Sequence, residues 1–244
     1  METETFSGVT VFILASNETN LLCETVAQVR RYCADEDLDR IVLVLKDRTC
    51  PAYETAQALL RENDRKLELY VQKKQGFILC LTELPPQVQS SHFVIMASDM
   101  ETDPQSLEMF IRIAKAHPRR IVCAAKWHRD SEVTGYGTLH ALCSRALNLF
   151  VSAAAHRRVY DPISFYQIYP LSVYKEMQYS QDESFLFEYT LKPLILDAEY
   201  AEIPTRYHHR SEGHSNFKFG IMARGSLTFC ATALRIYFKS KPHN

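Results

Sequence analysis

Three acidic residues closely follow one apolar segment of the chain. Residues 92–97 form a run of mostly apolar residues, and Asp99, Glu101 and Asp103 follow it at alternate positions. Carboxylates that follow a strand of a parallel sheet lie where such sheets bind ligands. Mg²⁺ and Mn²⁺ are typically held by one or two carboxylates together with phosphate oxygens of a substrate. We therefore predict a divalent-metal site formed by Asp99 and Glu101.

Each of these acids also has a structural interpretation. Asp103 precedes Pro104, a combination typical of a helix N-cap with proline at the first helical position. Glu101 could equally be a solvated loop acid. Asp99 stands two residues after the apolar run, where a cap or a surface position is less expected. The metal prediction therefore depends on Asp99 first and on Glu101 second.

Polar residues also follow two earlier apolar runs. Asn17 and Glu18 come after residues 9–14, and Asp47 comes after residues 41–45. A carboxylate at the end of a strand can accept hydrogen bonds from a base or a ribose. Asp47 could instead be a surface turn acid, and Glu18 an acid that favours the positive end of a helix dipole. Both interpretations stay open at this point.

A scaffold of alternating strands and helices must bring these residues together. Strands are expected at 9–14, 41–45, 67–71, 92–97 and 121–125, separated by helices at 20–33, 52–61, 76–84 and 106–116. Continuous apolar strands that alternate with helices indicate a parallel sheet covered on both faces. The expected fold class is therefore α/β, with a Rossmann-like, mostly parallel sheet flanked by helices.

The alternation changes after residue 125. A polar loop is expected over 126–137, a long helix over 138–155, a strand near 200–203, a loop over 205–215 and a last helix over 216–239. We expect a single domain over 1–244. Its half 1–125 would bind a nucleotide, and its half 126–244, with the C-terminal helix, would bind an acceptor.

The last helix has two possible positions. Leu227, Leu234 and Phe238 recur at helical spacing, and Arg224 and Arg235 add positive charge. The helix could pack on the protein's own core. It could instead lie in a membrane interface, where an apolar stripe and basic residues act together. Contact with a membrane surface through this helix is therefore one expectation.

Composition excludes several classes of protein. The net charge of −1 gives no global basic field, so nucleic acid is not expected as a partner. Neither a Gly-x-Gly-x-x-Gly turn nor a Gly-Lys-Ser loop is present, which argues against dinucleotide and P-loop sites. Seven cysteines without a Cys-x-x-Cys pair, and a beginning without a signal-peptide pattern, predict a cytoplasmic protein, at most peripheral at the inner face of the membrane.

Several segments stand in a fixed order along the chain. They are Leu14-Ala15-Ser16-Asn17-Glu18, Lys46-Asp47-Arg48-Thr49, Ala97-Ser98-Asp99, Ser144-Arg145-Ala146-Leu147-Asn148, Asp161-Pro162-Ile163-Ser164-Phe165-Tyr166-Gln167, Phe187-Glu188, Glu202-Ile203-Pro204 and Arg210-Ser211-Glu212-Gly213-His214-Ser215. Their order and spacing resemble the family 2 glycosyltransferases with a GT-A fold. The resemblance is strongest to the dolichyl- or polyprenyl-phosphate sugar synthase branch, the dolichol-phosphate mannosyltransferase-like enzymes.

This resemblance implies an inverting, metal-assisted transfer of a sugar from a nucleotide-diphosphate sugar donor. The acceptor would be a polyprenyl phosphate or a glycan hydroxyl, and the metal Mg²⁺ or Mn²⁺. The implied donor-binding residues are Ala15, Asn17, Glu18, Asp47, Ser98 and Asp99, and the acceptor-binding residues are Arg145, Ser164, Gln167 and Ser215. The catalytic residue that the resemblance implies is Asp99, and Arg210, in a glycine-containing loop, could clamp the same phosphates. Asp182, Glu183 and Glu188 are the candidate general bases for a hydroxyl acceptor, although Asp182 and Glu183 could instead cap and acidify the start of a helix.

Three positions depart from the family pattern. Ala15 replaces a proline, Ala97 replaces the first acid of the metal motif, and Gln167 replaces an arginine. The second change leaves Glu101 as the residue to compensate, and the third removes a charge-assisted contact to phosphate. Two alternatives from other classes remain: a non-catalytic nucleotide-sugar-binding protein of the same fold, and a nucleotidyltransferase.

Overall fold

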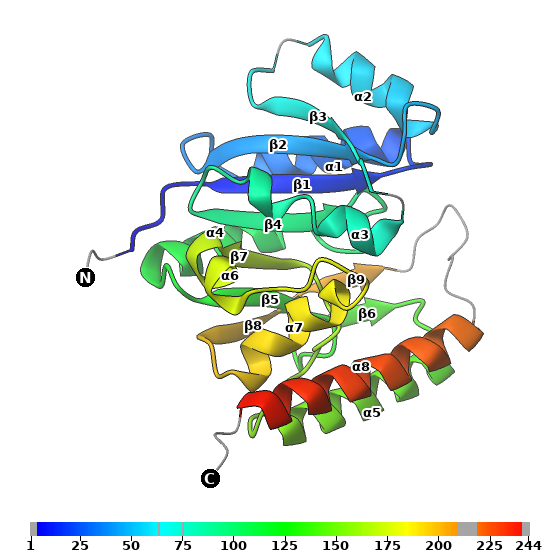
Figure 1. Ribbon diagram of the computed structural model, residues 1–244. Helices are drawn as coiled ribbons and strands as arrows, with labels where there is room; N and C mark the ends of the chain where they lie inside the picture. Colours follow the sequence, from blue (N-terminus) through cyan, green and yellow to red (C-terminus); the bar gives the residue numbers. More distant parts are fainter. Residues whose placement is uncertain (1–3, 63, 75, 209–218, 241–244) are drawn as a thin grey trace.

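A seven-stranded sheet runs through the molecule in the computed structural model, which describes residues 4–62, 64–74, 76–208 and 219–240 (Figure 1). Its strands are, in spatial order, β3 (Leu67–Val71), β2 (Leu38–Leu45), β1 (Val9–Ala15), β4 (His92–Ala97), β7 (Gln167–Pro170), β5 (Ile121–Ala125) and β8 (Tyr200–Pro204). Strand β7 runs antiparallel to both of its neighbours, and all the other pairings are parallel. The predicted α/β class with a mostly parallel sheet is confirmed.

Strand β1 lies in the middle of the parallel part. It pairs with β2 up to Ala15 opposite Leu45, and with β4 up to Leu14 opposite Ala97. Alternate side chains of β1 enter two different cores, Val11 on one face of the sheet and Phe12 on the other. This explains why the strand is apolar at nearly every position, since both of its faces are covered.

Three helices cover one face of the sheet: α1 (Asn20–Tyr32), α2 (Ala52–Leu60) and α4 (Ser106–Ala116). Apolar side chains at helical spacing form the contact. On α1 these are Leu22, Val26 and Val29, and on α4 the fully buried Phe110 is among them. Complete burial of such a side chain contributes about 1.5–3 kcal/mol.

The other face is covered by α3 (Phe77–Leu81), the short 3₁₀ helix η1 (Pro85–Gln87), α6 (Leu171–Met177) and α7 (Phe185–Ile195). Aromatic rings fill this core. Phe93 of β4 stacks on Tyr169 of β7 with ring centroids 5.6 Å apart, and Tyr189 of α7 lies 4.9 Å from Tyr169. Strand β7 was not predicted. It brings the half after residue 125 into the middle of the sheet.

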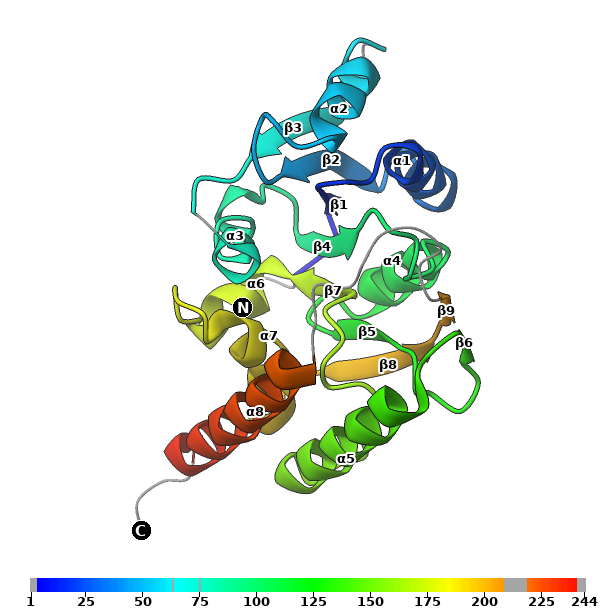
Figure 2. The same cartoon turned by 90° about the vertical axis from the view of Figure 1, so that its right-hand side faces the viewer.

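Helices α5 (Thr138–Ala154) and α8 (Phe219–Ser240) lie side by side beyond the β8 edge of the sheet (Figures 1 and 2). They form a third core with α7, which includes Val151, Leu191, Phe229 and Ile236. One side of the last helix therefore packs on the protein's own core. In the described part of the chain, no helix is long and apolar enough to cross a membrane.

A small ribbon completes the fold. Strands β6 (Glu132–Thr134) and β9 (Arg206–His208) pair in parallel, in stretches that were expected to be loops. Thr102, in the turn after β4, forms an isolated bridge with Tyr207 of β9. The ribbon thereby connects the second half of the chain to the predicted metal-binding turn.

Candidate active site

The strand order reverses between β1 and β4. The chain leaves β1 for β2 on one side and returns to β4 on the other, so the loops after these two strands diverge. Ligands of open α/β sheets bind outside such a reversal point, at the carboxyl ends of the strands. Leu14 pairs with Ala97, and so Asn17, Glu18 and Asp99 leave the sheet from adjacent strand ends.

A tight turn holds the two predicted metal ligands. The Oδ1 atom of Asp99 accepts the backbone N–H of Glu101 at 3.1 Å. Between them, Met100 adopts a φ of 56°, in the left-handed region of backbone conformation that residues other than glycine seldom occupy. The hydroxyl of Thr25 on α1 lies 3.4 Å from the Met100 sulfur. Such strain persists only where surrounding contacts hold it, and it often occurs at functional sites.

Tyr207 of β9 faces this turn. Its hydroxyl interacts with the carboxylate of Glu101. Burial, followed by the negative charges of Glu101 and then, more weakly, Asp99, raises the pKa of this hydroxyl well above its ordinary value. The two carboxylates and the phenol therefore form one group at the carboxyl end of β4.

These residues fit a partly protein-bound divalent cation. Among the residues that the structure describes, no group of three or more His, Cys, Asp or Glu side chains could hold a metal. Asp99 and Glu101 thus offer one or two oxygen ligands. This is the ligand set of a Mg²⁺ or Mn²⁺ ion whose coordination is completed by substrate phosphates and water, and it differs from a closed structural site.

Asp103 has a structural role, although it is not the N-cap that its position before Pro104 predicted, because α4 begins at Ser106 and its N-cap is Gln105. Its Oδ1 atom accepts the N–H of Gln105 at 2.9 Å in the turn that begins α4. Its carbonyl accepts the hydroxyl of Tyr166 at 3.1 Å. Both contacts fix the end of the turn that contains Asp99 and Glu101.

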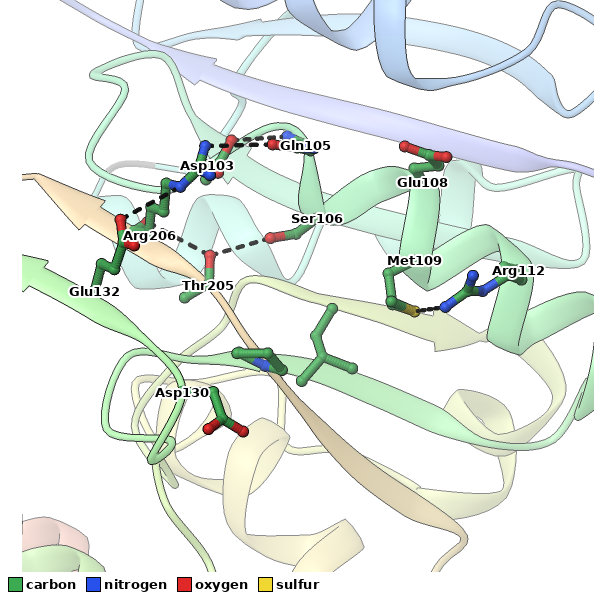
Figure 3. Close-up of a pocket in the computed structure, with 12 residues that line it drawn as sticks. Asp103, Gln105, Ser106, Glu108, Met109, Arg112, Asp130, Glu132, Thr205 and Arg206 are labelled. Carbon is green, nitrogen blue, oxygen red and sulfur yellow. Dashed lines mark hydrogen bonds and ion pairs between the residues drawn. The ribbon is translucent and has the colours of Figure 1, made fainter.

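A pocket of about 350 Å³ lies beside this turn, and residues that line it hold β9 in place (Figure 3). Thr205 and Ser106 share a hydrogen bond of 3.0 Å between their hydroxyls. Arg206 reaches Glu132 at 3.5 Å and the side-chain oxygen of Gln105 at 3.5 Å. These contacts fasten β9 to the start of α4 and to β6, and so they fix the position of Tyr207.

The acids after β1 and β2 shape their own turns. Glu18 accepts the backbone N–H groups of Ser16 at 2.9 Å and Asn17 at 3.0 Å. Asp47 accepts the hydroxyl of Thr49 at 2.6 Å and its N–H at 2.8 Å, and these bonds hold the pKa of Asp47 below its ordinary value. Both acids lie at the expected edge of the sheet, next to Ala15 at the end of β1.

Two predicted binding residues point elsewhere. The Ser98 side chain is buried and donates to the carbonyl of Leu14 at 2.9 Å, and Ser164 donates to the carbonyl of Ala124 at 3.1 Å. Gln167 is 1% exposed at the start of β7, and its side-chain nitrogen has no hydrogen-bond partner. We therefore correct two assignments, since the side chains of Ser98 and Ser164 bind backbone carbonyls, while the acceptor role of Gln167 stays a prediction.

The candidate bases near α7 divide into two kinds. Asp182 and Glu183 are exposed before the helix, where Asp182 accepts the N–H of Ser184 at 2.8 Å. Glu188 is buried and forms ion pairs with Lys192 at 2.9 Å and Arg235 at 2.8 Å. The geometry gives Glu188 a structural role between α7 and α8, which corrects its assignment as a base.

An aromatic wall was missed by the sequence reasoning. It consists of Trp127, Tyr136 and Tyr207, whose rings meet edge to face with centroids 5.1 Å apart between Trp127 and Tyr136 and 5.4 Å apart between Tyr136 and Tyr207. The guanidinium of Arg145 lies 5.5 Å from the centre of the Trp127 ring. Trp127 is the only tryptophan of the chain and follows β5 closely, a signal that could have drawn attention to it.

A buried ion pair lies beside this wall. Lys126, directly before Trp127, donates its ammonium to Asp161 at 2.9 Å, and both side chains are largely withdrawn from water. Asp161 also accepts the backbone N–H of Lys126 at 3.1 Å. The pair fixes the carboxyl end of β5 to the segment that follows α5. Of the remaining predicted residues, Arg210 and Ser215 lie outside the described residues.

The family model described as glycosyl transferase family 2 matches residues 10–179. The fold is similar to that of glucosyl-3-phosphoglycerate synthase from Mycobacterium tuberculosis. Its complex with Mn²⁺, uridine-diphosphate-glucose and glycerol 3-phosphate gives a TM-score of 0.69 at 15% identity, over 98% of this chain and 82% of that chain. Its complex with Mg²⁺ and uridine diphosphate gives 0.67 at 16% identity, over 98% and 81%. No match was found among curated proteins. At such low sequence identity, the structural similarity shows a shared fold and nothing more.

Proposed function

The chain belongs to glycosyl transferase family 2, and from this we propose that it transfers a sugar from a nucleotide-diphosphate sugar with the help of Mg²⁺ or Mn²⁺ at Asp99. The observation that carries the proposal is the turn of Asp99 and Glu101 at the reversal point of the sheet. The M. tuberculosis synthase of the same fold was solved with Mn²⁺, uridine diphosphate and glucosyl-3-phosphoglycerate. That complex supports a nucleoside diphosphate and a divalent cation as ligands here.

We propose a separate role for each residue around the turn. A bound metal would supply electrostatic stabilisation of the charge that develops on the leaving diphosphate. Asp99 would hold the metal, Glu101 would replace the acid that is missing at position 97, and Tyr207 would orient Glu101. Asp47 and Glu18 would receive the nucleotide. Arg210 keeps its proposed role as a clamp on the same phosphates.

We propose direct displacement with inversion at the anomeric carbon. The acceptor oxygen forms its bond to that carbon as the bond to the diphosphate oxygen breaks, and the diphosphate leaves with the electron pair. Residues 1–125 would carry most of the donor site, and residues 126–244 the acceptor site. The Asp99 turn and the aromatic wall, which share Tyr207, would meet at the reacting centre.

For the acceptor, we propose a phosphate-bearing molecule, and specifically a polyprenyl phosphate, as in the sugar synthase branch that the motifs resemble. Arg145 at the aromatic wall supports this, because a guanidinium suits phosphate recognition. A phosphate is already anionic and needs no general base. The pairing of Glu188 with two cations removes one of the three candidate bases. A glycan hydroxyl would need Asp182 or Glu183.

A radiolabelled donor assay tests the proposal. The protein is incubated with a panel of nucleotide-diphosphate sugars, with and without Mn²⁺, and with polyprenyl phosphate or an oligosaccharide. Metal-dependent release or transfer of the sugar is expected. Release of inorganic diphosphate from a nucleoside triphosphate and a sugar phosphate would instead favour a nucleotidyltransferase. Donor binding without any release would favour a non-catalytic binding protein.

The acceptor is tested by two substitutions in the same assay. Asp182→Asn and Glu183→Gln should each leave transfer to polyprenyl phosphate intact. If either change abolishes transfer while donor binding survives, a general base is present and the phosphate acceptor is wrong.

A further inference from the structure

One residue of the turn over 98–102, called the Asp99 turn below, has a strained backbone. Met100 lies between Asp99 and Glu101 and has a φ of 56°, although it is not a glycine. For a residue with a side chain, this left-handed conformation costs free energy relative to the right-handed one. Local contacts must therefore hold Met100 in place.

The side chain of Met100 is anchored on helix α1. Its sulfur lies 3.4 Å from the hydroxyl oxygen of Thr25, a residue that is completely buried. The same hydroxyl donates to the carbonyl of Leu21 at 2.7 Å, one turn earlier on α1, so the helix fixes its position. The contact thus holds the middle of the Asp99 turn against a helix that packs on the sheet.

Other contacts fix the two ends of the turn. Ser98 donates its N–H at 3.0 Å and its hydroxyl at 2.9 Å to the carbonyl of Leu14 in β1. At the other end, Thr102 bridges to Tyr207 of β9. The ends are therefore held by the sheet and by the β6–β9 ribbon, whereas the middle is held by a side chain.

The conformation of Met100 determines how its two neighbours meet. Asp99 accepts the N–H of Glu101 at 3.1 Å through its Oδ1 atom. The backbone angles of Met100 set the direction of that N–H, because they are the rotatable bonds between the two groups. A change of conformation at Met100 would therefore separate Asp99 from Glu101.

The anchor also connects the two loops that diverge at the reversal point of the sheet. Helix α1 begins at Asn20, soon after Asn17 and Glu18, and Thr25 lies on its second turn. Met100 belongs to the loop after β4. The contact between Thr25 and Met100 thus connects the proposed nucleotide side of the site to its proposed metal side.

We propose that Met100 is a positioning residue for the metal. Its side chain, anchored at Thr25, holds Asp99 and Glu101 in the arrangement that receives a divalent cation together with phosphate oxygens of the donor. Met100 acts through its neighbours, since Mg²⁺ and Mn²⁺ prefer oxygen ligands to a thioether sulfur. The inference rests on the proposed function and deepens it.

Met100→Gly separates the anchor from the strain. Glycine accepts a φ of 56° without strain, but it has no side chain to pack on Thr25 and gives the turn more conformational freedom. Binding of uridine and guanosine diphosphate is measured by calorimetry with and without Mn²⁺. The gain in affinity that Mn²⁺ brings should fall about tenfold, the lower end of the loss typical when a residue that orients a metal ligand is removed.

Two other properties of Met100→Gly should change little. Affinity without Mn²⁺ should equal that of wild type, because the turn would act on the nucleotide through the metal. The melting temperature should stay close to the wild-type value, because relief of the strain offsets the lost contact.

Two further variants serve as controls. Gln178→Gly relieves strain in the same way at a φ of 49°, after α6 and outside the Asp99 turn, and should leave the gain from Mn²⁺ unchanged. Met100→Leu keeps an apolar side chain of similar volume that can pack on α1, and it should retain most of the gain.

Three results would overturn the proposal. The first is a full wild-type gain from Mn²⁺ in Met100→Gly, and the second is an equal loss in Met100→Leu. The third is a loss of affinity without Mn²⁺ as large as the loss with it, because Met100 would then support the shape of the whole site.

Solvent exchange of the Glu101 amide, followed by NMR without nucleotide or metal, keeps this inference distinct from the proposed function. The amide should exchange about tenfold faster in Met100→Gly, because its bond to Asp99 would be formed for a smaller fraction of the time. Wild-type protein that gains no affinity from Mn²⁺ would contradict the proposed function, while faster exchange in the variant would still support the anchoring role of Met100. Equal exchange rates in the two proteins would contradict that role, whatever the effect of the metal.

Discussion

Replacement of Glu188 by glutamine keeps the side chain's length and removes its charge at the contact between α7 and α8. The buried carboxylate accepts the N–H of Ser180 at 3.0 Å and its hydroxyl at 2.9 Å, and pairs with Lys192 at 2.9 Å and Arg235 at 2.8 Å. Burial alone would raise the pKa of Glu188. The bonds from Ser180 and Lys192 more than offset this effect, so the pKa lies below its ordinary value of 4.5.

The expected loss follows from what the substitution leaves behind. Removal of one partner of a buried ion pair typically costs about 3–5 kcal/mol. Arg235 is 47% exposed and regains water, whereas Lys192 is only 16% exposed. We therefore expect the lower end, about 3 kcal/mol, or a fall of about 6–12 °C in the melting temperature of a domain of this size. Since the folded pKa is depressed, this stabilisation is present above the ordinary pKa and is lost as the pH falls through the folded value.

Thermal unfolding followed by circular dichroism at neutral pH measures the effect. Glu183→Gln makes the same chemical change at a nearby exposed position and should melt like wild type. Below its melting temperature, Glu188→Gln should keep its rate of donor-sugar release. A variant that melts with wild type and releases no sugar would refute this reasoning, because Glu188 would then act in the chemistry.

Three further changes are expected to have the following results. Burial raises the pKa of Glu202 to about 7, so the folded protein keeps a proton that the unfolded chain loses above its ordinary pKa of 4.5. The free energy of unfolding of the wild type should therefore fall by about 3 kcal/mol between pH 4.5 and about pH 7. Urea unfolding at a series of pH values should show a weaker pH dependence of this free energy for Glu202→Gln, and equal pH dependence in the two proteins would contradict the reasoning. Lys126→Met leaves Asp161 buried without its cation and should lower the free energy of unfolding in urea by about 3–5 kcal/mol, a prediction that a loss below about 1 kcal/mol would exclude. Tyr207→Phe removes the hydroxyl that interacts with Glu101. It should weaken metal-dependent binding of nucleoside diphosphate about tenfold in calorimetry, with an unchanged melting temperature, and unaltered affinity would count against an orienting role for Tyr207.

The parallel part of the sheet could be predicted because its strands are apolar on both faces. The expected strands at 67–71, 92–97 and 121–125 agree with β3, β4 and β5. Strand β7 could not be predicted, because four residues that begin with Gln167 carry little periodicity and pair through the neighbours β4 and β5. Strands β6 and β9 escaped notice for the same reason, since each has only three residues in polar surroundings.

Some features of the candidate site could be predicted from the sequence, and others could not. The place of Asp99 follows from its position after a buried strand, which the chain sequence reveals directly. The inward direction of Ser98, Gln167 and Glu188 depends on long-range packing, and motif spacing contains no information about it. Tyr207 reaches Glu101 only because β9 pairs with β6 and bridges to Thr102.

The apolar side of α5 shows a further limit of periodicity. The exposed Leu139, Leu142 and Leu149 have the same residue type as Leu147, which packs against the third core. A helix with apolar residues on more than one side does not reveal which side is buried. The structure was needed to find the exposed leucines.

The most direct test of the central claim is calorimetry of nucleoside diphosphate binding, with and without Mn²⁺, to wild-type protein and Asp99→Asn. Uridine and guanosine diphosphate serve as the probes. Wild-type protein should bind one of them more tightly when Mn²⁺ is present. Asp99→Asn should lose that gain and reduce sugar release by about 10²-fold or more, because stabilisation of the leaving group supplies several kcal/mol. Its melting temperature should stay that of wild type. Equal metal-dependent affinity and equal sugar release in the two proteins would contradict the metal site at Asp99.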